Sequence, residues 1–363
     1  MTGASLRGAL LMRADGPARA PLHIAGDTFA AAPAEGAATI DLPGHVVFPG
    51  LVNAHDHLQV NAVPQLPSGA PFPNSYLWAA AFGAHFRDPA VVAALAVPAA
   101  IRCWQGGLKN LLAGATTVAH HDPWNPVLDD PHFPVRLLRK FGWCHSLGLA
   151  PREGLPGKLL DRLRGLLGGG APFGPPVVGS FTATPAGAPW IIHLAEGTDA
   201  VARGELARLE ALGCLAANTI IVHGVGLSPA NVERVVARGA GVVWCPSSNL
   251  ALLGATLVPR RLFDAGRLAL GTDARLSGAR DLLDELGGAA ARDALTPGEL
   301  VRLVTSDAAR LLAMPGVGGL APGQRAGPHG RRAPSARAFP TVISARPFRK
   351  VKPPVDLLVS IGG

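Results

Sequence analysis

Residues 48–58 read FPGLVNAHDHL, and this stretch decides the fold. The run VVFPGLV is rich in β-formers, so His55 and His57 stand where a buried strand ends. Side chains two apart on a strand point to the same side, which lets both imidazoles reach one point, as two ligands of a zinc-like ion would. A lone H-x-H pair is a weak signal, because histidine is also a common core and surface residue.

Short apolar runs alternate with segments of helical period from residue 46 onward, the pattern of parallel β/α units. We predict eight strands, the number that closes a (β/α)8 TIM barrel. They cover residues 45–55, 114–121, 143–150, 177–183, 190–196, 219–224, 241–246 and 268–273. The segment between the fourth and fifth strands is too short for a crossover helix, so we expect the fourth helix to be missing or reduced to a loop and the barrel to be irregular.

The length of 363 residues fits one α/β barrel with a small attachment. Short apolar runs with Gly and Pro punctuation fill the first 44 residues and predict a few strands beside the barrel. We therefore expect an α/β protein in three parts. Residues 1–48 begin a small β-sandwich-like domain, residues 49–315 form the irregular (β/α)8 TIM barrel, and residues 316–363 hold the remainder of the β-domain and a basic, Pro-rich tail.

Composition excludes several classes of protein. The sequence contains no long apolar stretch of the kind a membrane helix needs, and the apolar run at the N-terminus is too short for a secretory signal. Four cysteines stand far apart in apolar surroundings and predict buried free thiols, so we expect a cytoplasmic protein. Of the net charge of +8, most belongs to residues 327–363, where seven basic side chains face Asp356 alone. A nearly neutral body predicts no nucleic-acid partner and no membrane partner.

Three further polar residues end apolar strands: His193 in WIIHLAE, His223 in TIIVHG and Asp273 in LALGTD. In a parallel barrel the carboxyl ends of all strands open on the same face, so these side chains should join the first histidine pair. Histidines of an ordinary core would be scattered along their strands, and the combined placement therefore predicts a metal site. Nitrogen and oxygen ligands without thiolate suit Zn²⁺, with Fe²⁺ or Mn²⁺ as alternatives.

With these motifs in place, the sequence resembles the amidohydrolase superfamily over most of its length. The resemblance rests on P-G-x-x-x-x-H-x-H, G-A-T-T-V, H-L-A-E, V-H-G, C-P-S-S-N, G-T-D and S-D-A-A-R-L-L. It is similar to the branch of cytosine, guanine and adenosine-type deaminases and triazine hydrolases, whose mark is a Glu three residues after the fifth-strand His, here Glu196. That branch lacks a bridging Lys on the fourth strand, and VVGSFTA has none, so the resemblance implies one divalent ion.

The resemblance and the strand positions together imply roles for these residues. Glu196 would transfer a proton, and His223 would orient the water and stabilise the oxyanion. Asp273 could also accept the proton of the water. The alternative for Glu196 is a surface carboxylate that opens a helix, favourable to the helix dipole. The ligands of the ion would be His55, His57, His193 and Asp273.

Substrate-binding residues are less well marked by the sequence. We select His121, which follows the second strand in HHDPW, Asn249, which follows the seventh in CPSSN, and Trp78, in the long segment after the first strand. Loops that follow barrel strands build the pocket, but core packing or a turn at HHD is the alternative for each.

These observations predict a metal-dependent hydrolase that cleaves a carbon–nitrogen bond of a small heterocyclic substrate by deamination. The alternatives are amidase-type or chlorohydrolase-type hydrolysis and a non-catalytic relative. No motif names the substrate or the leaving group. We expect the small molecule as partner, and a homodimer is also compatible with the sequence.

After Ala326 the sequence departs from the family pattern. Residues 327–354 contain six prolines and seven basic side chains, which resist incorporation into a sheet. A reading-frame change and a divergent tail both explain such a segment. We expect it to be largely irregular, with residues 355–360, VDLLVS, as a potential edge strand.

Overall fold

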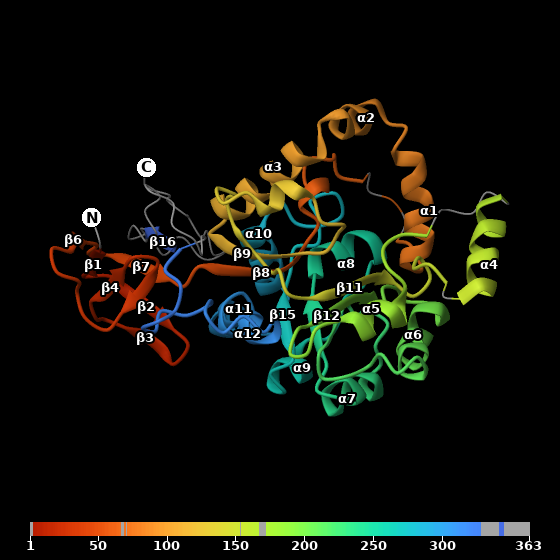
Figure 1. Ribbon diagram of the computed structural model, residues 1–363. Coiled ribbons are helices and arrows are strands. Elements are labelled where there is room, and N and C mark those ends of the chain that lie inside the picture. The colour runs from red at the N-terminus through yellow and green to blue at the C-terminus, as the bar shows by residue number, and fades with distance from the viewer. Residues whose placement is uncertain are drawn as a thin grey trace.

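The computed structural model describes residues 3–66, 69, 71–152, 154–166, 172–327 and 341–344. Small sheets built from the first 48 residues form one end of the molecule, and a larger body of parallel strands and helices follows (Figure 1). The described residues therefore have the mixed α/β content that the sequence predicts.

The N-terminal end consists of two four-stranded sheets, with strand orders β5-β4-β1-β6 and β16-β7-β2-β3. Their apolar core contains Leu11, Phe29 and Val47 together with Leu320 and Ala326, so the segment that follows the last helix packs against the first strands. The backbone NH of Phe29 donates to the carbonyl of Gln324 at 2.8 Å. The strands are β1 Gly3–Arg7, β2 Leu10–Arg13, β3 Gly16–Ala18, β4 Leu22–Ala25, β5 Thr28–Ala30, β6 Ala38–Asp41, β7 His45–Phe48 and β16 Thr341–Ser344.

The larger body contains two parallel sheets, with strand orders β10-β9-β8 and β11-β12-β13-β14-β15. Most of these strands are buried runs of β-branched and aliphatic residues, as expected for parallel strands covered on both faces. The two sheets meet beside β8, where the NH of Thr272 donates to the carbonyl of His55 at 3.0 Å. The strands are β8 Leu51–Asp56, β9 Ala115–His120, β10 Arg136–Leu137, β11 Gly142–Ser146, β12 Trp190–Leu194, β13 Thr219–His223, β14 Gly241–Trp244 and β15 Leu268–Leu270.

One predicted strand is wrong. Residues 177–183 form the helix α5, Val177–Ala183, and β11 pairs directly with β12 in their place. Pro176 precedes the first helical residue, and the NH of Ser180 donates to its carbonyl at 2.9 Å. Tertiary packing overrides the β-propensity of VVGSFTA, because Phe181 packs its ring against Trp190. Among the described residues, the short strand β10 was not predicted.

The remaining helices lie around the parallel strands (Figure 1). The helix α7, Pro229–Ala237, begins after Ser228, whose hydroxyl accepts from the NH of Asn231 at 3.2 Å. The helices are α1 Ser75–His85, α2 Pro89–Ala96, α3 Ala99–Leu112, α4 Gly154–Leu166, α6 Ala200–Ala211, α7 Pro229–Ala237, α8 Pro246–Leu253, α9 Arg260–Asp264, α10 Leu282–Ala290, α11 Pro297–Leu303 and α12 Ser306–Leu311, with 3-10 turns at Leu58–Val60 and Pro126–Asp129.

No single helix in the described part of the chain is long and apolar enough to cross a membrane. The pair α2 and α3 reaches the required length and composition only together, and it is bent by 97° at its break.

The C-terminal tail is described only at residues 341–344. This segment is the strand β16, which pairs antiparallel with β7, so the expectation of irregular structure is wrong there. Residues 355–360, the predicted edge strand, lie outside the described residues.

A buried carboxyl group holds the start of α8. Glu285 on α10 is fully buried, and its Oε1 accepts from the NH of Ser247 at 2.9 Å, which caps a helix that has no side-chain cap of its own. Burial raises the pKa of Glu285 to about 8. Between the ordinary pKa of a glutamate and a pH of about 8, the Glu285 carboxyl therefore keeps its proton in the folded protein and loses it in the unfolded chain.

This carboxyl group predicts a pH-dependent stability difference. As pH rises from the ordinary pKa of a glutamate to about 8, the folded state still holds its proton while the unfolded state has lost it, so stability falls through this window. We expect Glu285→Gln to be more stable than the wild type by a few kcal/mol, roughly, at pH 8.5 and close to it at pH 4. Urea unfolding at both pH values measures this. The control is Asp284→Asn, an exposed neighbour. An equal effect of Glu285→Gln at both pH values would contradict the assignment.

Candidate metal centre

Four predicted residues converge at the carboxyl ends of the parallel strands. His55 and His57 come from the end of β8, His193 from β12, and Asp273 follows β15. The Nε2 atom of His193 lies 3.1 Å from that of His55 and 3.4 Å from that of His57. The Oδ1 atom of Asp273 lies 3.4 Å from the Nε2 atom of each of these two histidines. Three nitrogens and one oxygen thus surround one point.

These separations can be compared with the requirements of a metal ion. Ligands at roughly 2.0–2.1 Å from zinc stand roughly 3.3–3.4 Å apart in a tetrahedral arrangement. The observed separations of 3.1–3.4 Å match that value. Three imidazoles and a carboxylate, with no thiolate, also form a donor set that zinc accepts. The residues therefore fit a divalent ion.

Further hydrogen bonds orient these side chains. The Nδ1 atom of His57 lies 2.8 Å from Oδ2 of Asp122, and Nδ1 of His193 lies 2.9 Å from the carbonyl of His145. A partner at Nδ1 directs Nε2 toward the shared point, as in many metal centres. From the sequence alone we expect no more than a turn at HHD, because nothing in HHDPW reveals that Asp122 contacts a histidine 65 positions earlier.

The Asp273 carboxylate is fixed in the same way. Its Oδ2 atom accepts from the hydroxyl groups of Ser248 and Ser277, each at 2.6 Å. Burial opposes its ionisation, but hydrogen bonds to His55 and His57 outweigh burial and hold the pKa of this carboxyl well below its usual range. The group is therefore an anion that faces the histidines.

Burial also sets the charge of the imidazoles. It lowers the pKa of His55 to about 4 and that of His193 well below its usual range. Neutral imidazole is the form that binds metal. His57 differs, because Asp122 outweighs the effect of its burial and raises its pKa.

Glu196 and His223 lie beside the four converging residues. Burial raises the pKa of the Glu196 carboxyl, whose Oε1 atom lies 3.7 Å from Nε2 of His223. The same oxygen accepts from the indole Nε1 of Trp78 at 3.1 Å. Nδ1 of His223 lies 2.8 Å from Oδ1 of Asn249, which leaves Nε2 free to face the carboxyl. The structure thus brings together all predicted catalytic residues and all three predicted substrate residues, because the ring of His121 also stacks on that of His193.

The backbone is unusual where the strands end. Ala195, His223 and Asp273 have φ angles of 53°, 74° and 60°, a left-handed conformation that side chains disfavour. Non-glycine residues persist there only where their surroundings hold them, and such positions cluster at functional sites. Two of the three are predicted site residues, and the third precedes Glu196.

Asp56, between the two β8 histidines, is fully buried and was missed by the sequence analysis. Its carboxylate is surrounded by amide, hydroxyl and ammonium groups from β8, α3 and the segment after β15. The sequence H-x-H does not reveal which groups surround the carboxylate at its middle position. They are Asn53 at 3.1 Å, Asn61 at 2.6 Å, Asn110 at 2.9 Å, Thr272 at 3.1 Å and Lys109 at 3.5 Å.

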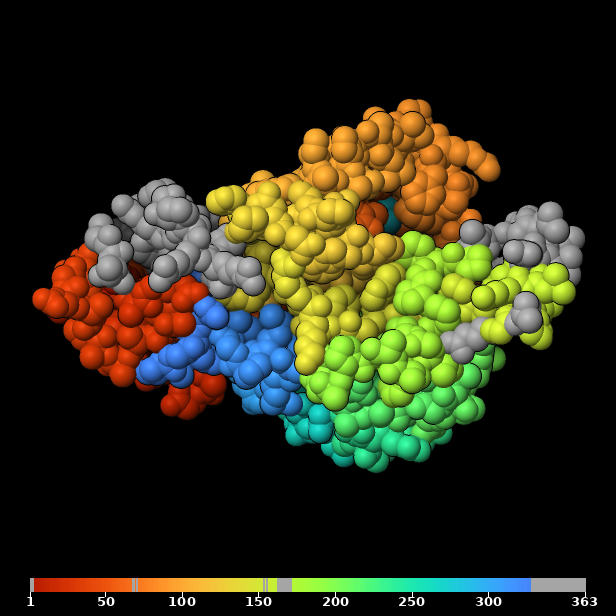
Figure 2. Space-filling view, viewed as in Figure 1, coloured from red at the N-terminus to blue at the C-terminus, as the bar shows by residue number. Residues whose placement is uncertain are grey.

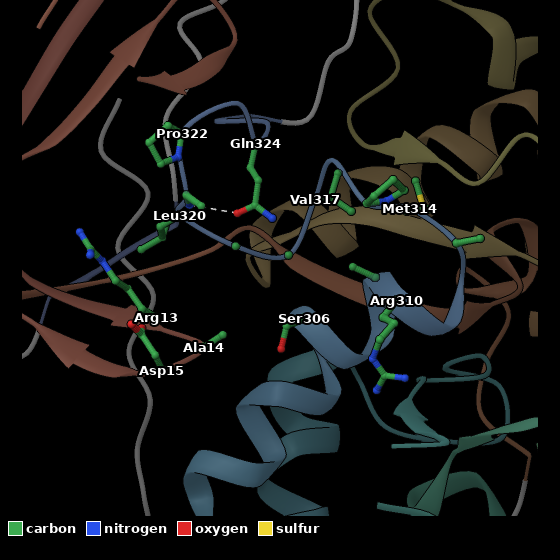
Figure 3. A pocket seen from close by; sticks show the side chains of 16 residues that line it. Arg13, Ala14, Asp15, Ser306, Arg310, Met314, Val317, Leu320, Pro322 and Gln324 are labelled. Atoms are coloured by element: carbon green, nitrogen blue, oxygen red, sulfur yellow. Dashed lines mark hydrogen bonds between the residues drawn. The ribbon is translucent and has the colours of Figure 1, made fainter. Parts of the chain in front are cut away.

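The molecular surface has a recess close to β8 and β15. Figure 2 shows a recess between the orange segment of α1–α3 and the yellow segment, with atoms in the colours of the residues near β8 and β15 at its base. A separate cavity of about 640 Å³ lies between the β2–β3 turn and α12, lined by Arg13, Asp15 and Arg310 among others (Figure 3). None of the predicted site residues lines it. We therefore place the candidate site at the histidines, where ligand geometry is present.

Part of the chain is similar in sequence to known proteins. Residues 182–327 match the amidohydrolase family. The 5-methylthioadenosine/S-adenosylhomocysteine deaminase of Haloarcula marismortui is 32% identical over 117 residues, which cover 30% of this chain and 27% of the relative. The 8-oxoguanine deaminase of Pseudomonas aeruginosa is 30% identical over 127 residues, or 32% of this chain and 28% of the relative. The aligned segments thus span about a third or less of these two relatives.

Solved structures resemble the chain over a greater length. A zinc-bound adenosine deaminase from Xanthomonas campestris has a TM-score of 0.66 and 20% identity, covering 94% of this chain and 84% of its own. The atrazine chlorohydrolase of Arthrobacter aurescens TC1, complexed with zinc, has a TM-score of 0.68 and 18% identity, covering 94% and 86%. At these identities the likeness shows the fold alone. The resemblance stated from the sequence motifs is confirmed: residues 182–327 match the amidohydrolase family, and the relatives that match in sequence are deaminases.

Proposed function

We propose that the protein is a metal-dependent hydrolase that deaminates a small aminated heterocycle. The observation that carries this proposal is the convergence of three histidine nitrogens and the Asp273 oxygen beside a buried glutamate. The Nε2 atoms of His55 and His57 each lie 3.1–3.4 Å from Nε2 of His193 and 3.4 Å from Oδ1 of Asp273. The two curated relatives described above are deaminases of heterocyclic compounds, which supports this choice of reaction.

Each residue beside the ion would have its own role in the reaction. A divalent ion, when bound, makes water a nucleophile at neutral pH. Glu196, with its raised pKa, would carry a proton to the ring nitrogen or to the leaving amine. His223, fixed by Asn249, would orient the attacking water and stabilise the oxyanion. Asp273 could accept the first proton, since its Oδ1 atom faces the histidines.

The metal we propose is a single Zn²⁺ ion, with Fe²⁺ or Mn²⁺ as alternatives. His55, His57, His193 and Asp273 would hold it. Imidazole nitrogen favours zinc and iron, while a carboxylate is compatible with all three. The strand that precedes β12 and pairs with it is β11, Gly142–Ser146, and its lack of a lysine also supports one ion, because it offers no bridging carbamate.

Ammonia release from a panel of aminated heterocycles tests the proposed reaction. The purified protein is first loaded with zinc, and ammonia is then measured against a sample stripped by a chelator. We expect metal-dependent release from at least one purine, pyrimidine or triazine amine. Zinc-loaded protein that releases chloride from chlorinated analogues but no ammonia would replace deamination with dehalogenation.

The same proposal covers the barrel, the small β-domain and the location of the protein in the cell. Residues 49–315 would form an irregular (β/α)8 barrel, a reading supported by the contact between β8 and the segment after β15. Residues 1–48 and 316–363 would form the small β-domain, supported by their shared apolar core. Cytoplasmic location is supported by four buried free cysteines, which suit a reducing compartment.

Truncation tests the division between these parts. A chain that ends at Gly327 lacks β16, so β7 loses a sheet neighbour while every proposed ligand remains. We expect unchanged metal content, a lower melting temperature and more aggregation through the exposed edge of β7. Elemental analysis and thermal unfolding of the truncated and full-length chains measure this. Loss of the metal on truncation would show that the tail supports the centre.

A further inference from the structure

His121 has a nitrogen that the proposed function does not use. It directly follows β9 and is fully buried. Its Nε2 atom lies 3.2 Å from the carbonyl oxygen of Cys144. A carbonyl can only accept, so Nε2 carries the proton and Nδ1 keeps a lone pair. Within the described part of the chain, this buried Nδ1 has no hydrogen-bond partner.

The ring of His121 lies against the proposed ligands. Its centroid is 4.5 Å from that of His193, with the rings stacked, and 5.1 Å from that of His55. One nitrogen of each of His55, His57, His121 and His193 lies within 4.8 Å of the others. A second group with the same spacing contains His55, His193, His223 and Asp273. Two four-residue sets therefore share His55 and His193.

We propose that His121 is an additional ligand of the metal ion, through Nδ1. This inference rests on the metal centre of the proposed function and extends it. The spread of up to 4.8 Å is too wide for four tetrahedral neighbours, but ligands on opposite sides of an ion stand roughly 4 Å apart. His121 would therefore join the ligand group at its outer edge, after a small rotation of its ring. Coordination also satisfies the buried lone pair.

A four-imidazole set has consequences for Asp273. With four nitrogens on the ion, the carboxylate becomes a replaceable ligand and is free to accept a proton. Neutral nitrogen ligands also favour Zn²⁺, Co²⁺ and Cu²⁺ over Mg²⁺ and Mn²⁺. The metal should therefore persist when Asp273 is changed, but not when Asp273 and His121 are changed together.

The test compares His121→Phe with His120→Phe. Phenylalanine keeps a ring against His193 and Trp143 but has no lone pair. His120 is the matched control, because it is equally buried and adjacent, yet it belongs to neither of the two sets. Zinc affinity is measured by competition with a chelator, and the cobalt-loaded proteins are compared by visible absorption, which reports coordination number.

We expect His121→Phe to weaken zinc binding by at least about tenfold and to change the cobalt spectrum, and His120→Phe to change neither. Asp273→Asn should keep one ion per chain, and the double variant should lose it. Wild-type affinity and spectrum in His121→Phe would overturn the inference and leave the lone pair to a substrate. Wild-type protein that binds no ion would instead refute the metal centre itself. If His121→Phe does not fold, His121→Asn carries the same comparison.

Discussion

His193→Ala should bind no stoichiometric metal. His193 belongs to both four-residue sets, so its loss removes a nitrogen from every arrangement that the side chains can form. Its Nε2 atom also lies within 3.4 Å of the Nε2 atoms of both His55 and His57, so its loss removes a neighbouring ligand nitrogen from both of them. Elemental analysis after dialysis against metal-free buffer measures the result.

The control for this variant removes a histidine that lies elsewhere. His132 is exposed on a turn, so His132→Ala should keep the wild-type metal content. Circular dichroism of both variants separates loss of the ion from loss of the fold. Undiminished metal in folded His193→Ala would show that the ion binds at another place.

Glu196→Gln should keep the metal and lose turnover by about 10²-fold or more. Glutamine keeps an oxygen to accept from the Trp78 indole and has nearly the same volume, so the surroundings need not move. It cannot carry a proton to the substrate, which is the function we propose for this carboxyl. Metal content and ammonia release, measured on the same sample, give the two results.

A glutamate on the surface provides the comparison for this second variant. Glu210 on α6 forms an ion pair with Arg234 far from the strand ends, so Glu210→Gln should change neither metal content nor turnover. If Glu196→Gln loses its metal, Glu196 is a ligand. If it keeps full activity, another group transfers the proton.

The strand-end histidines could be predicted because a simple rule places them. Residues at the carboxyl ends of parallel strands share one face, and His55, His193 and His223 each follow an unmistakable apolar run. No structural detail was needed to expect that these side chains meet.

Features that depend on tertiary contacts could not be predicted. The run VVGSFTA has strong β-propensity, and only its packing against Trp190 and the preceding proline make it helical. The partners of Asp56 are distributed over more than 200 residues, and a single sequence gives no sign of such pairs. The role of His121 depends on which of its nitrogens faces a carbonyl, and this is a property of the folded chain.

The separation of the ligands along the chain bears on biosynthesis. His55 leaves the ribosome long before Asp273, and at usual rates the interval is on the order of 10–40 s. During that time the nascent chain holds histidines without the geometry that makes them selective, exposed to whatever ion is abundant. Asp56 bonds to Thr272, so the β8 histidines gain their final orientation only when the last parallel strand has docked. The selective centre is thus complete only once β15 and the residues after it have docked, and a chain interrupted before Asp273 would not hold the ion in its place.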